Sequence, residues 1–223
     1  MEPMFSKLLS AFISFSNTLF DVVLPPTVRA QKTKTLTLSD FSVAPEVHSL
    51  HGIDITTLLS YSDTAVQNLI RSLKYDNSHH AVHLCALLLA DFLQEEVANL
   101  KLLSPRPIWI VPVPLHPSRE RERGYNQIAR ILEALPKEFH DGTHASIRPD
   151  TLQRVQDTLT QTRLSKYERW ENVRNAFEVK HVVPNVHIII VDDVATTGAT
   201  LAACIQTFKK ADVSVQALAL ARA

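Results

Sequence analysis

Apolar residues recur along this chain in short runs that polar segments separate. The run at 188–191 is β-branched and wholly apolar, which predicts a strand buried on both faces, as in a parallel sheet. Further strands are predicted at 53–60, 108–112, 151–155, 177–179 and 213–220. Apolar residues at helical spacing predict helices at 61–73, 78–97, 125–135 and 201–210. The strand at 108–112 is expected to be the first of a central sheet.

The N-terminal segment has a different pattern. Residues 4–24 carry apolar side chains at helical spacing, interrupted by polar residues such as Lys7 and Asp21. This predicts an amphipathic helix that docks on the body or on a partner; a signal or membrane-surface helix is the alternative, and no membrane span is expected. Residues 28–50 are polar and predict a loop, with room for a short hairpin at 35–43. We expect an appendage at 1–54 and one α/β domain at 55–223.

Composition narrows the class of protein. The chain is 45% hydrophobic and 21% charged, as is usual for a globular domain. Its formal net charge is zero, so it lacks the overall basic charge typical of nucleic-acid binders, and no direct DNA binding is expected. Cys85 and Cys204 lie in apolar helical runs, which predicts buried free thiols in a cytoplasmic, reducing compartment. The chain has no CxxC, so no structural zinc is expected.

The residues most suited to bind a ligand follow the strand at 188–191. Asp192 and Asp193 come first, then a small-residue loop at 195–200, then a helical pattern. A helix N-terminus attracts phosphate through its unpaired N–H groups, and small side chains let the backbone approach it. The two carboxylates are suited to accept hydrogen bonds from sugar hydroxyls beside that phosphate. The alternative is an ordinary strand-to-helix turn with a threonine cap.

Two other segments bear on a ligand site. The strand at 108–112 must end near Pro112, and the loop after it carries Arg119, Arg121 and Arg123. α/β folds place ligands at this end of a strand, so these arginines could meet a pyrophosphate; a solvated helix start is the alternative. The long polar segment 157–175 predicts a mobile active-site cover, or else a solvated helix.

The acidic pair and the Thr-Thr-Gly-x-Thr that follows resemble the phosphoribosyl pyrophosphate (PRPP) loop of type I phosphoribosyltransferases. The resemblance implies an α/β fold with a mostly parallel central sheet flanked by helices, beside the small N-terminal helical and irregular appendage. It implies that Asp192 and Asp193 hold the ribose 2′- and 3′-hydroxyls and serve catalysis, and that Mg²⁺ binds with PRPP. It also implies that the loop holds the 5′-phosphate through Ala195, Thr196, Thr197, Gly198, Ala199 and Thr200.

Further segments over about 55–223 resemble the ComF family, also called competence protein F or GntX-like. The matching pieces include Leu73-Lys74-Tyr75, Val111-Pro112-Val113-Pro114-Leu115-His116, Arg123-Gly124-Tyr125-Asn126-Gln127, and the polar residues Gln161, Thr162, Arg169 and Asn172 of the cover segment. Most relatives carry an N-terminal zinc ribbon. Here Thr27 and Ala30 occupy the expected positions of its first cysteines, so the chain resembles a member without zinc.

The resemblance implies a function of two kinds. The first is phosphoribosyltransferase activity with an open acceptor, linked to DNA uptake through a helicase-like competence protein as partner. The second is a non-catalytic PRPP or nucleotide-binding sensor or scaffold. No nucleobase pocket is evident in the sequence to decide between them, and the oligomeric state stays open.

Overall fold

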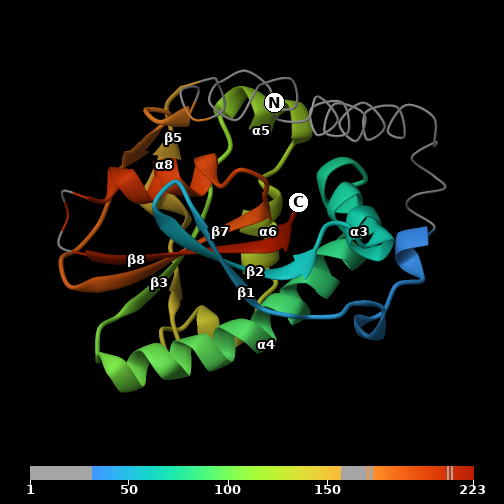
Figure 1. Ribbon diagram of the computed structural model, residues 1–223, viewed down its shortest axis with the longest axis horizontal. Helices are drawn as coiled ribbons and strands as arrows, with labels where there is room; N and C mark the ends of the chain where they lie inside the picture. The colour runs from blue at the N-terminus through green and yellow to red at the C-terminus, as the bar shows by residue number, and fades with distance from the viewer. Residues whose placement is uncertain (1–31, 157–169, 171–172, 210, 212) are drawn as a thin grey trace, which may run out of the picture.

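A six-stranded, mostly parallel sheet lies at the centre of the computed structural model, which describes residues 32–156, 170, 173–209, 211 and 213–223 (Figure 1). Only β1 is antiparallel to its neighbour; the other neighbouring strands are parallel, as expected. A separate antiparallel pair is formed by β5 (Leu152–Arg154) and β6 (Phe177–Val179). In sheet order the six strands are β1 (Glu46–Leu50), β2 (Ile53–Ser60), β8 (Val213–Arg222), β7 (Val186–Ala195), β3 (Ile108–Pro112) and β4 (Ser146–Ile147).

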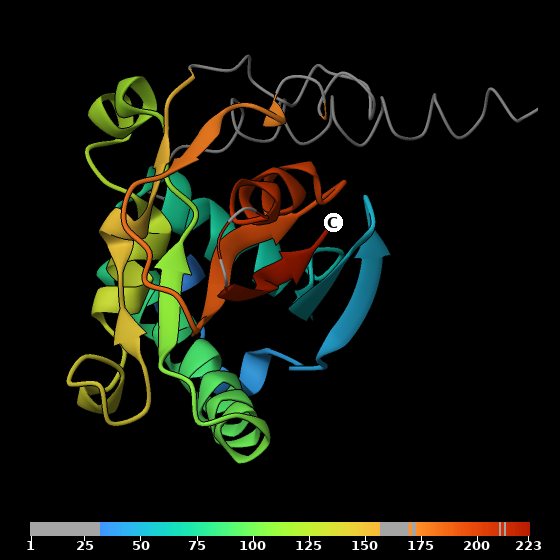
Figure 2. The same cartoon turned by 90° about the vertical axis from the view of Figure 1, so that its left-hand side faces the viewer.

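Helices cover both faces of the sheet (Figure 1, Figure 2). Apolar side chains of α3, α4 and α6 form one buried cluster with the sheet, and α8 packs into a second cluster with β5 and β6. The short α5 follows β3. The helices are α3 (Thr64–Tyr75), α4 (His79–Leu103), α5 (Pro117–Arg123), α6 (Gln127–Glu133) and α8 (Ala199–Thr207), with 3₁₀ turns η1 (Leu38–Asp40), η2 (Lys137–Phe139) and η3 (Pro149–Thr151).

Strand β7 is buried on both faces, as its sequence predicts. Ile189 and Val191 pack with the α3–α4–α6 side, whereas Ile188 and Ile190 pack with the α8 side. This alternation follows from the two-residue period of a strand. The strand runs on through both aspartates to Ala195, further than the apolar run indicates. The two carboxylates therefore start from opposite faces of one strand.

Local signals set most of the element boundaries. Asp63 caps α3 and Ser78 caps α4, each accepting a hydrogen bond from a backbone N–H, so the helices predicted at 61–73 and 78–97 are confirmed, the first with its start at Thr64. The strand predicted at 53–60 is confirmed as β2. It pairs antiparallel with β1, the strand that precedes it in the chain. The turn between them is His51-Gly52, with φ of 52° and 73°, as a two-residue hairpin turn requires.

Three predictions need correction. The central sheet does not begin with β3, because β1 and β2 precede it. The hairpin allowed at 35–43 is absent from the described residues; η1 lies there, and the hairpin is β1–β2. Part of the expected arginine loop folds as α5, which begins with Pro117 in its first turn after the His116 cap.

Other expectations lie outside the described part of the chain. The helix predicted at 4–24 falls there, as does most of the cover segment. The division expected after residue 54 stays a prediction; that position lies within β2, which pairs with β8. Among the helices that the structure describes, none combines the length and the apolar character needed to cross a bilayer.

Candidate functional site

A small-residue loop connects β7 to α8 at the carboxyl end of the sheet. The end of β7, this loop and the first turn of α8 (residues 194–201), together with Asp192, line a small hollow. Gly198 has φ of 78° and is the N-cap of α8. A Cβ atom at Gly198 would lie 2.8 Å from Ile55 Cδ1 and 2.9 Å from Leu50 Cβ, so only glycine fits against the β1–β2 hairpin. The loop thus presents backbone and the N-terminus of α8 to the hollow, as the sequence predicts.

The carboxylates of Asp192 and Asp193 have different surroundings. Asp192 is partly buried and lines the loop hollow. Asp193 is only 6% exposed and its carboxylate lies on the other face, toward α3 and α6. The backbone N–H of Asp193 donates to Oδ1 of Asp192 at 2.8 Å. The two acids are therefore coupled through the main chain while their side chains serve different faces.

Two groups hold the Asp193 carboxylate. Its Oδ2 lies 3.0 Å from Nζ of Lys74, near the end of α3, and accepts from Nε2 of Gln127 at 2.7 Å. Burial is the largest single effect on the pKa of Lys74 and lowers it, but the charge and hydrogen bond of Asp193, together with Asp192 and Tyr61, outweigh burial and the pKa is raised. Sequence reasoning gave neither Lys74 nor Gln127 a role. Their only signal is that both belong to segments that resemble the ComF family.

The carboxyl of Asp192 is poised to change its charge near neutral pH. Burial, and next the negative charge of Asp193, raise its pKa to about 7. The backbone N–H of Asp193 and the charges of Lys74 and Arg154 act in the opposite direction. Donors of hydrogen bonds, such as sugar hydroxyls, would favour the ionised form of this group.

The Gly-Tyr-Asn segment between α5 and α6 has a structural role at each residue. Gly124 ends α5 with φ of 82°. The hydroxyl of Tyr125 donates to the carbonyl of Leu73 at 2.8 Å and so ties the end of α3 to this turn. Asn126 caps α6 and donates through Nδ2 to the carbonyl of Val113 at 3.0 Å. This turn therefore brings α3, β3 and α6 together beside Asp193.

Of the three predicted pyrophosphate-binding arginines, Arg123 is linked to the acids through Gln127. Arg123 donates through a guanidinium nitrogen to Oε1 of Gln127 at 3.2 Å, and Gln127 in turn bonds Asp193. Arg119 is partly buried and Arg121 is exposed on the same helix. Pyrophosphate binding by Arg119, Arg121 and Arg123 stays a prediction.

Arg222, the last residue of β8, contacts the loop, a role that the sequence did not reveal. From the end of β8 its guanidinium donates to the carbonyl oxygens of Ala195 (2.9 Å) and Thr196. It thereby fixes the first part of the loop from the neighbouring strand. A lone arginine at the end of an apolar strand was its only signal.

The expected cover residues Gln161, Thr162, Arg169 and Asn172 lie outside the described residues. Trp170, from the same segment, is described. Its ring stacks on that of His51 with centroids 5.0 Å apart and 15° between the planes. Trp170 therefore lies at the turn of the β1–β2 hairpin, and the neighbouring Leu50 lies against Gly198 of the loop before α8.

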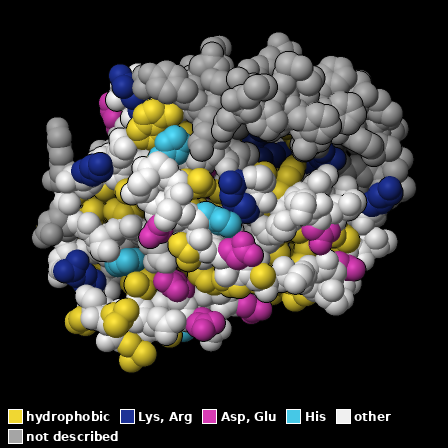
Figure 3. Space-filling view, in the orientation of Figure 1, with side chains coloured by type: hydrophobic (Ala, Val, Ile, Leu, Met, Phe, Trp, Pro, Cys, Tyr) yellow, Lys and Arg dark blue, Asp and Glu magenta, His cyan; other side chains and the backbone are white. Residues whose placement is uncertain are grey.

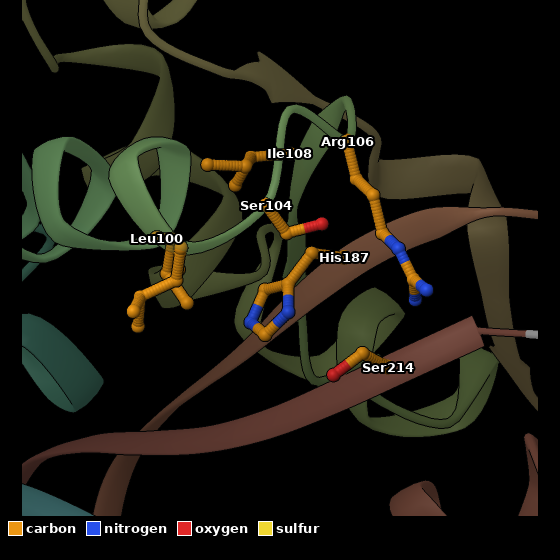
Figure 4. Close-up of a pocket in the computed structure, with 7 residues that line it drawn as sticks. Leu100, Ser104, Arg106, Ile108, His187 and Ser214 are labelled. Atoms are coloured by element: carbon orange, nitrogen blue, oxygen red, sulfur yellow. The ribbon is translucent and has the colours of Figure 1, made fainter.

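A second hollow, of about 170 Å³, lies at the opposite end of the strands, and Figure 4 shows residues that line it. Arg106, His187 and Ser214 line it with leucines from the end of α4, and burial lowers the pKa of His187. It lies at the amino ends of β3, β7 and β8, whereas α/β folds bind ligands at the carboxyl ends. The smaller hollow at the loop is therefore the candidate site.

The donor set at the loop fits a Mg²⁺ ion that arrives with its substrate better than one held by protein. In the part of the chain that the structure describes, no group of three or more His, Cys, Asp or Glu side chains could hold a metal. Oδ2 of Asp193 already bonds a cation and an amide. Mg²⁺ commonly keeps its waters and binds through substrate phosphates, and such a mode needs no protein cage.

The structure is an α/β domain with a mostly parallel sheet, and the glycine loop before α8 and the two acids lie at the carboxyl end of β7. The chain is 33% identical to competence protein F of Haemophilus influenzae over 159 residues, which are 70% of this chain and 67% of that protein. The chain therefore belongs to the ComF family, that of competence protein F. No sequence model of a known family matches it.

Other relatives have related names. DNA utilization protein YhgH of Salmonella typhi is 36% identical over 148 residues, 65% of this chain and 62% of that protein. This chain thus spans less than two thirds of that relative's length. Competence protein ComFC of Bacillus subtilis is 35% identical over 92 residues, 41% of this chain and 34% of that protein.

Two solved structures with some similarity are phosphoribosyltransferases. A hypoxanthine phosphoribosyltransferase of Staphylococcus aureus has a TM-score of 0.34 and 15% identity, over 60% of this chain and 62% of that one. An orotate phosphoribosyltransferase of Mycobacterium tuberculosis has a TM-score of 0.31 and 13% identity, over 87% and 82%. TM-scores this low carry no information about the ligand or the reaction of this protein.

Proposed function

We propose that this protein binds PRPP with Mg²⁺ at the loop 195–200 and transfers its phosphoribosyl group to an acceptor. One observation carries the proposal: a partly buried carboxylate, Asp192, lines the same hollow as the glycine N-cap of α8. A helix N-terminus suits a phosphate and a carboxylate suits sugar hydroxyls. A 5-phosphorylated ribose has both groups at opposite ends.

The residues of the chain would act mainly by positioning. The backbone of the loop and the N-terminus of α8 bind the 5′-phosphate, while Asp192 accepts from ribose hydroxyls. Arginines of α5 stabilise the departing pyrophosphate. Mg²⁺, held by substrate oxygens and water, would supply further neutralisation of the pyrophosphate charge.

The transfer exchanges one bond at the anomeric carbon. The bond from C1′ to the pyrophosphate oxygen breaks, and both electrons leave with that oxygen. A lone pair of the acceptor forms the new bond to C1′, and the acceptor releases its proton to the departing pyrophosphate or to water. The role of the protein is to hold the reactants in line and to exclude water from the cation-like C1′.

Binding without transfer is the second candidate. Among the described residues, the hollow is lined only by Asp192 and residues 194–201, and none of these is an aromatic group on which an acceptor base could stack. This observation favours a PRPP or nucleotide sensor or scaffold.

Titration calorimetry with PRPP and Mg²⁺, followed by a pyrophosphate-release assay with pooled bases and amines, tests both functions. Binding with acceptor-dependent release supports transfer, and binding without release supports the sensor. Asp192→Asn combined with Asp193→Asn should abolish binding with little loss of fold. Absence of binding by the folded wild-type protein overturns the proposal.

The names of the relatives suggest the process in which the protein works. We propose a role in DNA uptake or DNA utilization, exerted through a helicase-like protein partner. On the face shown in Figure 3, acidic and basic side chains are interspersed, and the net charge is zero, which favours a partner over direct DNA contact. Complementation of a Haemophilus influenzae strain that lacks competence protein F tests this role. Restored transformation that is lost with the paired aspartate variant supports it, and failure of an expressed wild-type chain contradicts it.

A further inference from the structure

The ion pair of Lys74 and Asp193 is largely shielded from solvent. The Lys74 side chain is 23% exposed and that of Asp193 9%. Gln127, which bonds the same carboxylate oxygen, is only 4% exposed. Charges removed from water require a partner in good geometry, and this pair has one at 3.0 Å with an amide beside it. The carboxylate of Asp193 is thus held by contacts with α3 and α6.

A hydrogen bond from the main chain of Asp193 links the fixed Asp193 to Asp192. The N–H of Asp193 donates to Oδ1 of Asp192, so a fixed Asp193 also fixes the orientation of the Asp192 carboxylate. On the other side, Gln127 accepts from Arg123 while it donates to Asp193. A continuous set of contacts therefore connects Lys74, both acids and the arginine helix α5.

Several titratable groups face the acids. Lys74 acts on both, and Arg154 of β5 acts on Asp192 from the α8 side. Tyr61 faces Lys74. The thiol of Cys85 faces Asp193, and that of Cys204 faces Asp192. Both thiols are fully buried with raised pKa values and stay neutral, so the charges that matter are two carboxylates and two cations.

We propose that Lys74 is a positioning residue of the phosphoribosyl site. With Gln127 it holds the Asp193 carboxylate on the α3–α6 face, and this leaves Asp192 as the acid that contacts the ribose hydroxyls. The inference rests on the proposed function. It departs from the expectation that both acids bind ribose, because only the Asp192 carboxylate lies on the side of the loop hollow.

Substitutions at the ion pair should move the pH dependence of binding in opposite directions. Lys74→Met leaves Asp193 without its cation, so the pKa of Asp192 rises and the midpoint of PRPP binding moves to higher pH. Asp193→Asn removes the nearest negative charge, so the midpoint moves to lower pH. Lys74→Arg keeps the charge and is the matched control. If Lys74 served folding alone, the pH midpoint of PRPP binding would move in the same direction in Lys74→Met and in Asp193→Asn.

The experiment measures PRPP–Mg²⁺ affinity by calorimetry between about pH 6 and pH 8, on variants whose folding is checked by thermal unfolding. At pH 7, we expect Lys74→Met to weaken binding about tenfold and Lys74→Arg to recover most of the loss. Asp192→Asn should weaken binding more than Asp193→Asn. Wild-type affinity and midpoint in folded Lys74→Met, or a greater loss in Asp193→Asn than in Asp192→Asn, would overturn the inference.

A second measurement separates this inference from the proposed function. Carbon-13 NMR of labelled aspartate carboxyls reports the titration of Asp192 without ligand, and it should show the same opposite shifts. If these shifts appear but the wild-type protein does not bind PRPP, the proposed function fails and the coupling of Lys74 to the acids stands. If Lys74→Met does not fold, Asp193→Asn and Lys74→Arg still decide. Absence of opposite shifts overturns the coupling.

Discussion

The carboxylates of Asp192 and Asp193, consecutive residues of β7, lie on opposite faces of the central sheet. Asp193 bonds Lys74 and Gln127 on the α3–α6 face, whereas Asp192 lines the hollow beside the loop before α8. One backbone hydrogen bond connects them. A motif that appears in sequence as two equal acids is, in the fold, one acid held by the protein and one that faces the candidate ligand site.

The free energy of unfolding of the ligand-free protein should fall as pH rises through the range in which Asp192 ionises. Its folded pKa of about 7 lies above the usual value near 4, so its contribution is fully present below about pH 4 and is lost as pH rises through about 7. Because the group keeps some contact with solvent, we expect an effect on the order of 2 kcal/mol. Urea unfolding at a series of pH values measures it.

Asp192→Asn is the control for that dependence. The variant should lack this part of the pH profile and be more stable than wild type by about 2 kcal/mol near pH 8, although it should no longer bind PRPP. An unchanged pH profile in the variant would show that another group titrates.

Gly198→Ala should destabilise the fold by about 2 to 4 kcal/mol and abolish phosphate binding. The substitution combines a positive φ with a Cβ that would lie 2.8 Å from Ile55 Cδ1. Gly142→Ala is the matched control, because Gly142 has φ of 84° but its nearest neighbour would be Ser146 Oγ at 3.7 Å. The control should lose only about 1 kcal/mol, the strain of the backbone alone. Equal losses in denaturant unfolding would contradict the close approach at Gly198.

Cys85 and Cys204 should be unreactive in the folded protein. Both are free and fully buried, and burial raises the pKa of each thiol, helped by the nearby acids. The thiolate is the reactive form, so labelling by a thiol reagent should be at least about a hundredfold slower in the native state than in denaturant. Rapid labelling of the native protein would contradict the burial of these helices.

A metal chelator should not lower the melting temperature of the protein. We predict no structural zinc, since Thr27 and Ala30 stand where a zinc ribbon would have cysteines. Structural zinc contributes directly to folding, so its removal would lower the melting temperature by many degrees. Thermal unfolding with and without chelator measures this, and a large drop would disprove the prediction.

The elements with strong local signals could be predicted from sequence. Two capping residues, Asp63 and Ser78, mark the starts of α3 and α4. The apolar run 188–191 predicts the centre of β7. The extension of β7 through the aspartates could not, because aspartate disfavours strands and the pairing of Asp192 with Ala219 on β8 imposes it. The two residues of β4 carry no periodicity at all.

The candidate site also has a part that could be predicted from the sequence and a part that could not. The loop at 195–200 is contiguous in sequence, so its place between β7 and α8 could be predicted, whereas its binding of phosphate stays a prediction. Lys74 could not, because a lysine in the last turn of a helix usually lies in solvent near the helix dipole. Its contact with Asp193 depends on the packing of α3 against the sheet, and the turn at Tyr125 helps to fix that packing.

The stacking of His51 on Trp170 gives the protein an intrinsic optical reporter. The chain has two tryptophans, and the other, Trp109, lies on β3 with the guanidinium of Arg148 5.4 Å from its ring centroid. Replacing Trp109 by phenylalanine would leave one indole, that of Trp170, beside the hairpin turn that adjoins the loop before α8. Its emission would follow events at the loop in real time, without any added label.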